Sequence, residues 1–147
     1  MDFLSSLNIS GSGLTAQKLR MDVISQNIAN AGVTRTENGT PYRRKMVVLS
    51  SINGDSFRDV LDRTNGTNAV KTGGVQVRSI VEDQSALVPV YNPNHPDADE
   101  EGYVMLPNVN TAQEMIDMMS ASRAYEANIT TFNATKAMIL KALEIGR

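Results

Sequence analysis

The sequence contains no cysteine and no tryptophan, and aromatic residues make up 5% of its 147 residues. The absence of cysteine excludes disulfides, thiolate nucleophiles and cysteine-ligated zinc. The formal net charge of -2 gives no electrostatic reason to expect nucleic acid or an anionic membrane as the main partner. A chain of this length has the size of one ordinary domain with a modest core.

Long apolar runs are also missing. No stretch approaches the roughly 20 consecutive apolar residues that a membrane span needs, so we expect no direct membrane insertion. The N-terminus MDFLSSLNIS has an acidic second residue, no basic flank and no continuous apolar run, unlike an ordinary secretory signal. We therefore expect a soluble protein that, if it leaves the cytoplasm, does so without a cleaved signal peptide.

The N-terminal part carries an apolar heptad pattern, formed by Leu7, Leu14, Met21 and Ile28 with Ile24 and Ala31. This spacing predicts one face of a helix that packs against a partner helix. Gly11 and Gly13 weaken the front and predict a break or bend there, with a firm helix from about Leu14 to Ala29. Asn30 and Gly32 supply a C-terminal stop.

The C-terminal part repeats the pattern more strongly. Thr111 and Glu114 have capping-box spacing, and Gly146 stands where a helix C-cap glycine belongs. Between these signals run two seven-residue registers. One contains Met115, Ser122, Ile129, Lys136 and Leu143; the other contains Met118, Tyr125, Phe132 and Ile139.

The predicted C-terminal helix is long for the chain. About 35 residues at about 1.5 Å each give about 50 Å, whereas a compact globule of this length is about 38 Å across. We therefore expect the helix to protrude, and a protruding apolar face needs a partner. The N-terminal helix can cover at most about half of it.

The middle of the chain reads as short strands. The β-rich runs are YRRKMVVLS (42–50), VQVRSIV (75–81), ALVPVY (86–91) and GYVML (102–106). Three Asn-Gly pairs, at 38–39, 53–54 and 65–66, favour tight reversals. Pro89 predicts an edge strand. The polar segment 54–74 is expected to be a loop or a short helical turn.

These patterns together predict an α+β fold. Long N- and C-terminal helices are expected to pack as an antiparallel, coiled-coil-like stalk, with a small irregular β-rich domain inserted between them. The expected division is residues 1–33 for the N-terminal helix, 34–107 for the middle domain and 108–147 for the C-terminal helix.

Three stretches invite chemical hypotheses that the sequence does not favour. GSGLTA (11–16) fits a dinucleotide fingerprint literally, but no strand is expected before it. His95 stands among carboxylates, yet the spacing fits no metal-binding loop and two flanking prolines favour a surface turn. The single histidine, with no nucleophile elbow and no paired carboxylates in an apolar setting, offers no catalytic site. We therefore expect no catalytic residue, no cofactor and no metal.

A basic cluster of Arg43, Arg44 and Lys45 follows Tyr42. Such a cluster can contact phosphates and an aromatic ring can stack on a base. Basic residues on a strand edge more commonly prevent edge pairing or form salt bridges. We therefore interpret the three residues as partner contacts on a protein-facing strip and expect no nucleic acid.

The two chain ends resemble the paired terminal signatures of bacterial flagellar axial proteins, in the stretches SGLTAQKLRMDVISQNIANAG and NVNTAQEMIDMMSASRAYEANITTFNATKAMILKALEIGR. In that family an Asn-Ile-Ala-Asn element, here Asn27 to Asn30, ends the N-terminal helix. An Arg-Ala-Tyr-Glu-Ala-Asn element, here Arg123 to Asn128, lies on the C-terminal helix. The short length and the stretches TRTENGTPYRRKMVV and HPDADEEGYVMLPNVN are most similar to proximal-rod subunits.

The resemblance implies a structural subunit of the basal-body rod, in the periplasmic space, exported by the flagellar type III apparatus. Terminal helices would assemble with copies, other rod subunits and rod-base or export-gate proteins into a tube that transmits torque and forms the export channel. The expected assembly interface is Leu7, Leu14, Met21, Ile24, Asn27, Ile28, Asn30, Met115, Met118, Ser122, Arg123, Tyr125, Asn128, Ile129, Phe132, Ile139 and Leu143.

Two alternatives stay open at the level of sequence. The first is a self-contained coiled-coil adaptor whose two helices satisfy each other in a monomer or dimer. The second is a metal-dependent or nucleotide-using enzyme built on His95 or on residues 11–16. The first would show a discrete compact oligomer, and the second would lose function on substitution of His95 or Gly13.

Overall fold

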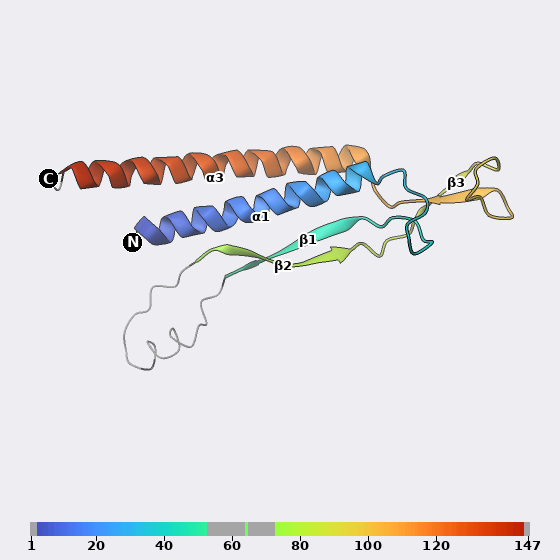
Figure 1. Cartoon of the computed structure of the whole chain (residues 1–147), viewed down its shortest axis with the longest axis horizontal. Coiled ribbons are helices and arrows are strands. Elements are labelled where there is room, and N and C mark those ends of the chain that lie inside the picture. The colour runs from blue at the N-terminus through green and yellow to red at the C-terminus, as the bar shows by residue number, and fades with distance from the viewer. Residues whose placement is uncertain (1–2, 53–63, 65–72, 146–147) are drawn as a thin grey trace. The chain divides into compact units, whose positions relative to one another are not determined.

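The computed structural model of the chain describes residues 3–52, 64 and 73–145 (Figure 1). Its elements are α1 (Phe3–Ala29), β1 (Lys45–Ser51), β2 (Val75–Glu82), β3 (Val88–Tyr91), β4 (Tyr103–Leu106) and α3 (Thr111–Ile145). Two terminal helices with short strands between them confirm the predicted α+β class. The four strands lie within or close to the four β-rich runs.

Helix α1 runs without interruption through Gly11 and Gly13, so the predicted break was wrong. The glycines cost helix propensity, but neighbouring contacts compensate for it. Ser12 accepts a hydrogen bond from the Val75 backbone N–H (3.1 Å) and donates to the Ile9 carbonyl (2.7 Å). A Cβ at Gly13 would lie 3.2 Å from Asn128 Oδ1 on α3, whereas one at Gly11 would meet nothing within 4 Å. Gly13 therefore permits close helix approach.

Substituting each glycine by alanine should show that Gly13 is a close-approach site and that Gly11 is not. Gly11→Ala is expected to stabilise the chain by up to about 1 kcal/mol, because alanine favours helix. Gly13→Ala should lack this gain or destabilise, because the Asn128 amide is held by its own bond to the Ala124 carbonyl (2.9 Å) and cannot yield freely. Urea unfolding of the two variants measures the difference. Equal stabilisation by both would show that Gly13 is not a close-approach site.

Helix α1 ends at Ala29, as predicted, and the backbone N–H and side-chain amide of Asn30 both donate to the Gln26 carbonyl. The N-cap of α3 differs from the prediction. Asn110, and not Thr111, accepts hydrogen bonds from the first turn, at the backbone N–H groups of residues 112 and 113. The Glu114 side chain turns away from this cap. The proposed C-cap residue Gly146 lies outside the described residues.

The strands form two small sheets, β1 with β2 and β3 with β4. The second pair is antiparallel, with Pro89 opposite Met105 and Tyr91 opposite Tyr103. Pro89 therefore lies on an edge strand, as predicted. The tyrosine rings pack edge to face, with centroids 5.4 Å apart.

The turn at Asn38-Gly39 is the predicted tight reversal, because Gly39 adopts φ +77° and its N–H donates to the Thr36 carbonyl (2.9 Å). A positive φ of this kind suits glycine. The other two Asn-Gly pairs, and nearly all of the predicted 54–74 loop, fall outside the described residues.

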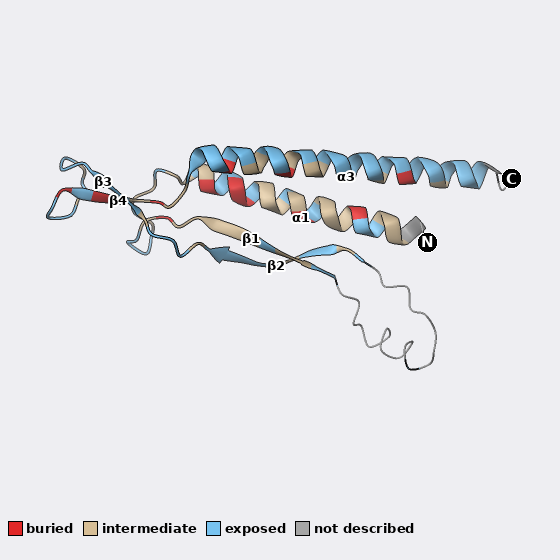
Figure 2. Cartoon of the chain, turned by 180° about the vertical axis from the view of Figure 1, so that it is seen from behind, coloured by how far each residue is buried: buried red, intermediate tan, exposed pale blue. Residues whose placement is uncertain are grey.

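The chain divides into two compact units, one formed by Met1–Lys18, Leu49–Arg78 and Arg123–Arg147, the other by Leu19–Val48 and Ser79–Ser122. Within each unit a stretch of α1 runs beside a stretch of α3 (Figure 1). The second unit holds most of the buried apolar residues, namely Val23, Ile24, Tyr42, Val104 and Ala121. Figure 2 shows α3 exposed along much of its length. The three-part division predicted from sequence stays a prediction.

Candidate functional site

A buried asparagine joins three elements of the second unit. Asn27, on α1, is 1% exposed, and its amide nitrogen donates to the Lys45 carbonyl (2.8 Å) and to Glu114 Oε2 on α3 (2.9 Å). Its amide oxygen accepts from the Lys45 N–H and from the Tyr42 hydroxyl, both at 2.9 Å. Every donor and acceptor of the amide is therefore used. We call Asn27, Tyr42, Lys45, Glu114 and Arg44 the Asn27 hub.

Arg44 supplies the positive charge of the hub. Its Nε lies 2.6 Å from Oε1 of Glu114, which is itself 1% exposed, and its other nitrogens lie 3.5 Å from Asp117 and 3.9 Å from Asp83. A buried carboxylate without a cation would be very costly, so the pair depends on both members. Arg20 of α1 adds a weaker contact to Asp117 at 3.8 Å.

Asn108 and Asp83 contact the hub residue Arg44. The Asn108 side chain accepts from the Arg44 N–H (2.8 Å) and donates to the Asp83 carbonyl (3.1 Å) and the Ser85 hydroxyl (2.8 Å). Hydrogen bonds from the backbone and side chain of Ser85, and then the charge of Arg44, hold the pKa of Asp83 below its usual value. The Asp83 carboxylate therefore stays ionised to lower pH than it would without these contacts.

Burial raises the pKa of the Tyr42 phenol above 10.0, and the carboxylates of Glu114 and Glu82 raise it further. The folded chain therefore holds this proton more tightly than the unfolded chain. The resulting stability is fully present below pH 10 and declines as pH rises through the folded pKa.

Tyr42→Phe should reveal this dependence. At neutral pH the variant is expected to lose about 1 kcal/mol, since one buried hydrogen bond disappears while Asn27 keeps its bond from Lys45. Above pH 10 the difference in free energy of unfolding between parent and variant should shrink, because only the parent can lose the Tyr42 proton. Urea unfolding between pH 7 and pH 11 measures it. A difference that stays constant over this range would contradict the assignment.

The two predicted registers of α3 differ in burial. Met118, Tyr125, Phe132 and Ile139 are all half-buried. In the other register Met115 is 56%, Ile129 37% and Leu143 67% exposed. Further large apolar side chains are exposed on the same helix, namely Ile116, Met119, Met138 and Leu140. We call Met115, Ile129 and Leu143 the exposed register.

The remaining predicted interface residues show mixed burial. On α1, Ile24 and Asn27 are buried, while Leu7, Leu14, Met21, Ile28 and Asn30 are half-buried. On α3, Ser122 and Asn128 are half-buried and Arg123 is exposed. The structure brings Asn27 together with Glu114, a residue that the sequence analysis took for a capping residue.

The basic strip is largely engaged within the chain. Arg44 belongs to the hub, Arg43 donates to the carbonyls of Asp83 (3.4 Å) and Ser85 (3.3 Å), and the Lys45 ammonium lies 5.8 Å from the centroid of the Tyr42 ring. All three basic side chains thus have partners within the described part of the chain. Contact of these residues with another protein stays a prediction.

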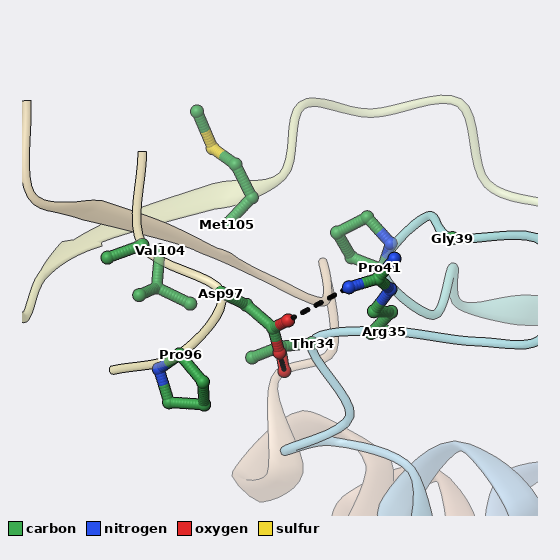
Figure 3. A pocket seen from close by; sticks show the side chains of 9 residues that line it. Thr34, Arg35, Gly39, Pro41, Pro96, Asp97, Val104 and Met105 are labelled. Atoms are coloured by element: carbon green, nitrogen blue, oxygen red, sulfur yellow. Dashed lines mark hydrogen bonds and ion pairs between the residues drawn. The ribbon is translucent and has the colours of Figure 1, made fainter. Parts of the chain in front are cut away.

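The acidic loop around His95 is tied to the segment that follows α1. Asp97 accepts a hydrogen bond from the Thr34 hydroxyl (2.8 Å) and pairs with Arg35 (3.7 Å) beside a pocket of about 270 Å³ (Figure 3). His95 Nδ1 accepts from the Asp97 N–H (3.1 Å). Across the described ranges no three residues of metal-ligating type gather into a group.

Residues 11–16 lie in the interior of α1, so they do not form the strand-to-helix turn that the dinucleotide fingerprint requires. Within the described residues, neither helix combines the length and hydropathy needed to cross a bilayer.

Comparison with known families addresses the two helical ends. A family model described as "Flagella basal body rod protein" matches residues 7–35, and one described as "Flagellar basal body rod FlgEFG protein C-terminal" matches residues 100–145. The first match covers α1 from Leu7 onward, including the element from Asn27 to Asn30, and the second covers β4 and α3. Both ends of the chain therefore match flagellar basal-body rod proteins.

Relatives that align over nearly the whole of both chains identify the family more closely. The flagellar basal-body rod protein FlgC of Bacillus subtilis is 50% identical over 151 residues and covers all of both chains. Its counterpart in Borreliella burgdorferi is 48% identical over 99% of this chain and 98% of its own, and that of Escherichia coli O6:H1 is 40% identical over all of both. The chain belongs to the family of flagellar basal-body rod proteins FlgC.

The hub was not predicted from the sequence, because each of its members has a plausible local role there. A signal was nevertheless present. Asn27 lies three residues after Ile24, and Glu114 lies four before Met118, so both are polar residues on predicted apolar faces. A polar residue at such a position needs a specific partner.

Proposed function

We propose that the chain is a structural subunit of the proximal rod that assembles through the exposed register of α3, together with α1, into a helical tube. The observation that carries this proposal is the contrast between the two registers. One is half-buried, while the other leaves large apolar side chains in solvent. Ile116, Met119, Met138 and Leu140 are exposed on the same helix, and large apolar side chains gathered in solvent along one element indicate an interaction surface.

The half-buried register is proposed to pack on α1 as an antiparallel, coiled-coil-like pair. Two contacts support this arrangement, Gly13 with Asn128 in one unit and Asn27 with Glu114 in the other. The partners are 14 residues apart on both helices, which is two heptads.

Copies of the chain and other rod subunits are the proposed partners, with rod-base and export-gate proteins at one end. Head-to-tail contacts that do not close into a ring generate a helical tube, which can transmit torque and enclose an export channel. The proposed place is the periplasmic part of the basal body, reached by type III export. Membership in a family of rod proteins supports a structural role and not a catalytic one.

The absence of cysteine permits a direct test. Leu143→Cys places one thiol at a position that is 67% exposed. A maleimide should label it rapidly in the purified subunit and slowly in isolated basal bodies, because neighbouring subunits cover the exposed register. The same basal bodies after dissociation serve as the control and should label rapidly again. Equal labelling before and after dissociation would contradict the proposal.

A further inference from the structure

Heptad faces alone do not determine which residues lie opposite one another. The α1 face repeats every seven residues from Leu7 to Ile28, and the half-buried face of α3 repeats every seven from Met118 to Ile139. A slide of one heptad, about 10 Å along a helix, would again place apolar residues opposite apolar residues. The apolar contacts therefore discriminate poorly between registers.

The Asn27 hub does discriminate. A slide that brought Arg20 opposite Glu114 would separate Glu114 Oε2 from the Asn27 amide and take away the buried hydrogen bond between the two helices. A buried polar group without a partner is costly. Since Lys45 begins β1, the hub also ties the helix pair to the sheet.

We infer that Asn27 is the register-determining residue of the α1–α3 pair, acting through its hydrogen bond to Glu114. A single buried asparagine has this role in coiled coils, where it selects one alignment at a cost in stability. The inference rests on the proposed antiparallel pair and adds what selects its alignment. When the alignment of α1 with α3 is fixed, the exposed register of α3 lies at a fixed position along the helix axis, where neighbouring subunits can contact it.

A hydrogen-bond reversal tests the inference. In Asn27→Asp two carboxylates face each other, and the bonds from position 27 to Glu114 and to the Lys45 carbonyl are both lost. Adding Glu114→Gln restores the bond between positions 27 and 114 with the opposite polarity, while the Lys45 carbonyl lacks its donor in both variants. The new amide at position 114 can donate to the new carboxylate at position 27, while the amide oxygen still accepts from Arg44 Nε. The single variant should lose the register and the double variant should regain it.

Engineered cysteine pairs report the register in the free, full-length chain. Gly13→Cys with Asn128→Cys reports the observed alignment, and truncation of Asn128 leaves room for the new Cβ. Ser6→Cys or Arg20→Cys, each with Asn128→Cys, reports a slide of one heptad in either direction. A short bifunctional thiol reagent should join 13 to 128 in the parent background and should not join the slid pairs.

With Asn27→Asp alone we expect loss of the 13–128 product and appearance of a slid product, and with the double variant we expect recovery of the 13–128 product. Retention of the 13–128 product in the single variant would overturn the inference, as would failure of the double variant to recover it while circular dichroism shows parental helix content. The cross-linking experiment uses the free chain and does not depend on assembly of the rod. A failed register test therefore leaves the labelling result for Leu143 unaffected.

Discussion

Replacing Asn27 by leucine is expected to destabilise the unit that contains residues 19–48 and 79–122 by at least about 2 kcal/mol. The leucine would leave four groups without their partner, namely the Lys45 N–H, the Lys45 carbonyl, the Tyr42 hydroxyl and Glu114 Oε2. Each such group costs about 1 to 3 kcal/mol when it stays buried. Burial of the leucine side chain returns about 2 kcal/mol of this loss.

Asn30→Leu is the matched control, because Asn30 belongs to the same motif and its side chain makes one exposed bond to the Gln26 carbonyl. We expect a loss below about 1 kcal/mol for this variant. Urea unfolding gives the free energies, and hydrogen exchange of residues 19–29 and 111–122 locates the change. Similar losses for both variants would show that Asn27 has no special role in stability.

Introducing a charge into the exposed register is expected to abolish incorporation into the rod without unfolding the subunit. Met115→Glu suits this purpose because Met115 is 56% exposed and lies near the start of α3, where a negative charge favours the helix. In an assembled interface the same carboxylate would be buried, at a cost of several kcal/mol unless it finds a cation. Cells that carry this variant as their sole copy should therefore not swim.

Gln113→Glu is the control for this experiment. It adds the same charge in the same helical turn, at an exposed residue that is outside the exposed register. Unfolding midpoints of both variants should stay close to that of the parent, and only Met115→Glu should be missing from isolated basal bodies. Normal incorporation of Met115→Glu would show that rods do not assemble through this register.

Local sequence signals account for the elements themselves. Apolar residues at heptad spacing made α3 recognisable over its full 35 residues, and β-rich runs between turn signals marked all four strands. The break predicted at Gly11 and Gly13 was wrong for a physical reason. The helix-propensity cost of glycine is only about 1 kcal/mol, and tertiary contacts such as the bond from the Val75 N–H to Ser12 override it.

The capping interpretation of Glu114 was wrong for a related reason. A carboxylate three residues after a threonine fits a capping box by spacing alone, but its partners in the structure are Asn27 and Arg44. Asn27 lies 87 residues away along the chain. Spacing within one helix contains no information about a partner at that separation.

The sequence by itself therefore determined the two helices, the β-rich middle, the apolar registers and the family resemblance, since all of these depend on residues close together in the chain. Tertiary structure alone decided which register of α3 is half-buried and which is exposed, and it alone joined Asn27, Tyr42, Arg44 and Glu114. The physical reason is that a heptad repeat is the same at every turn. A hydrogen-bonded amide with four partners is satisfied in one arrangement of the chain.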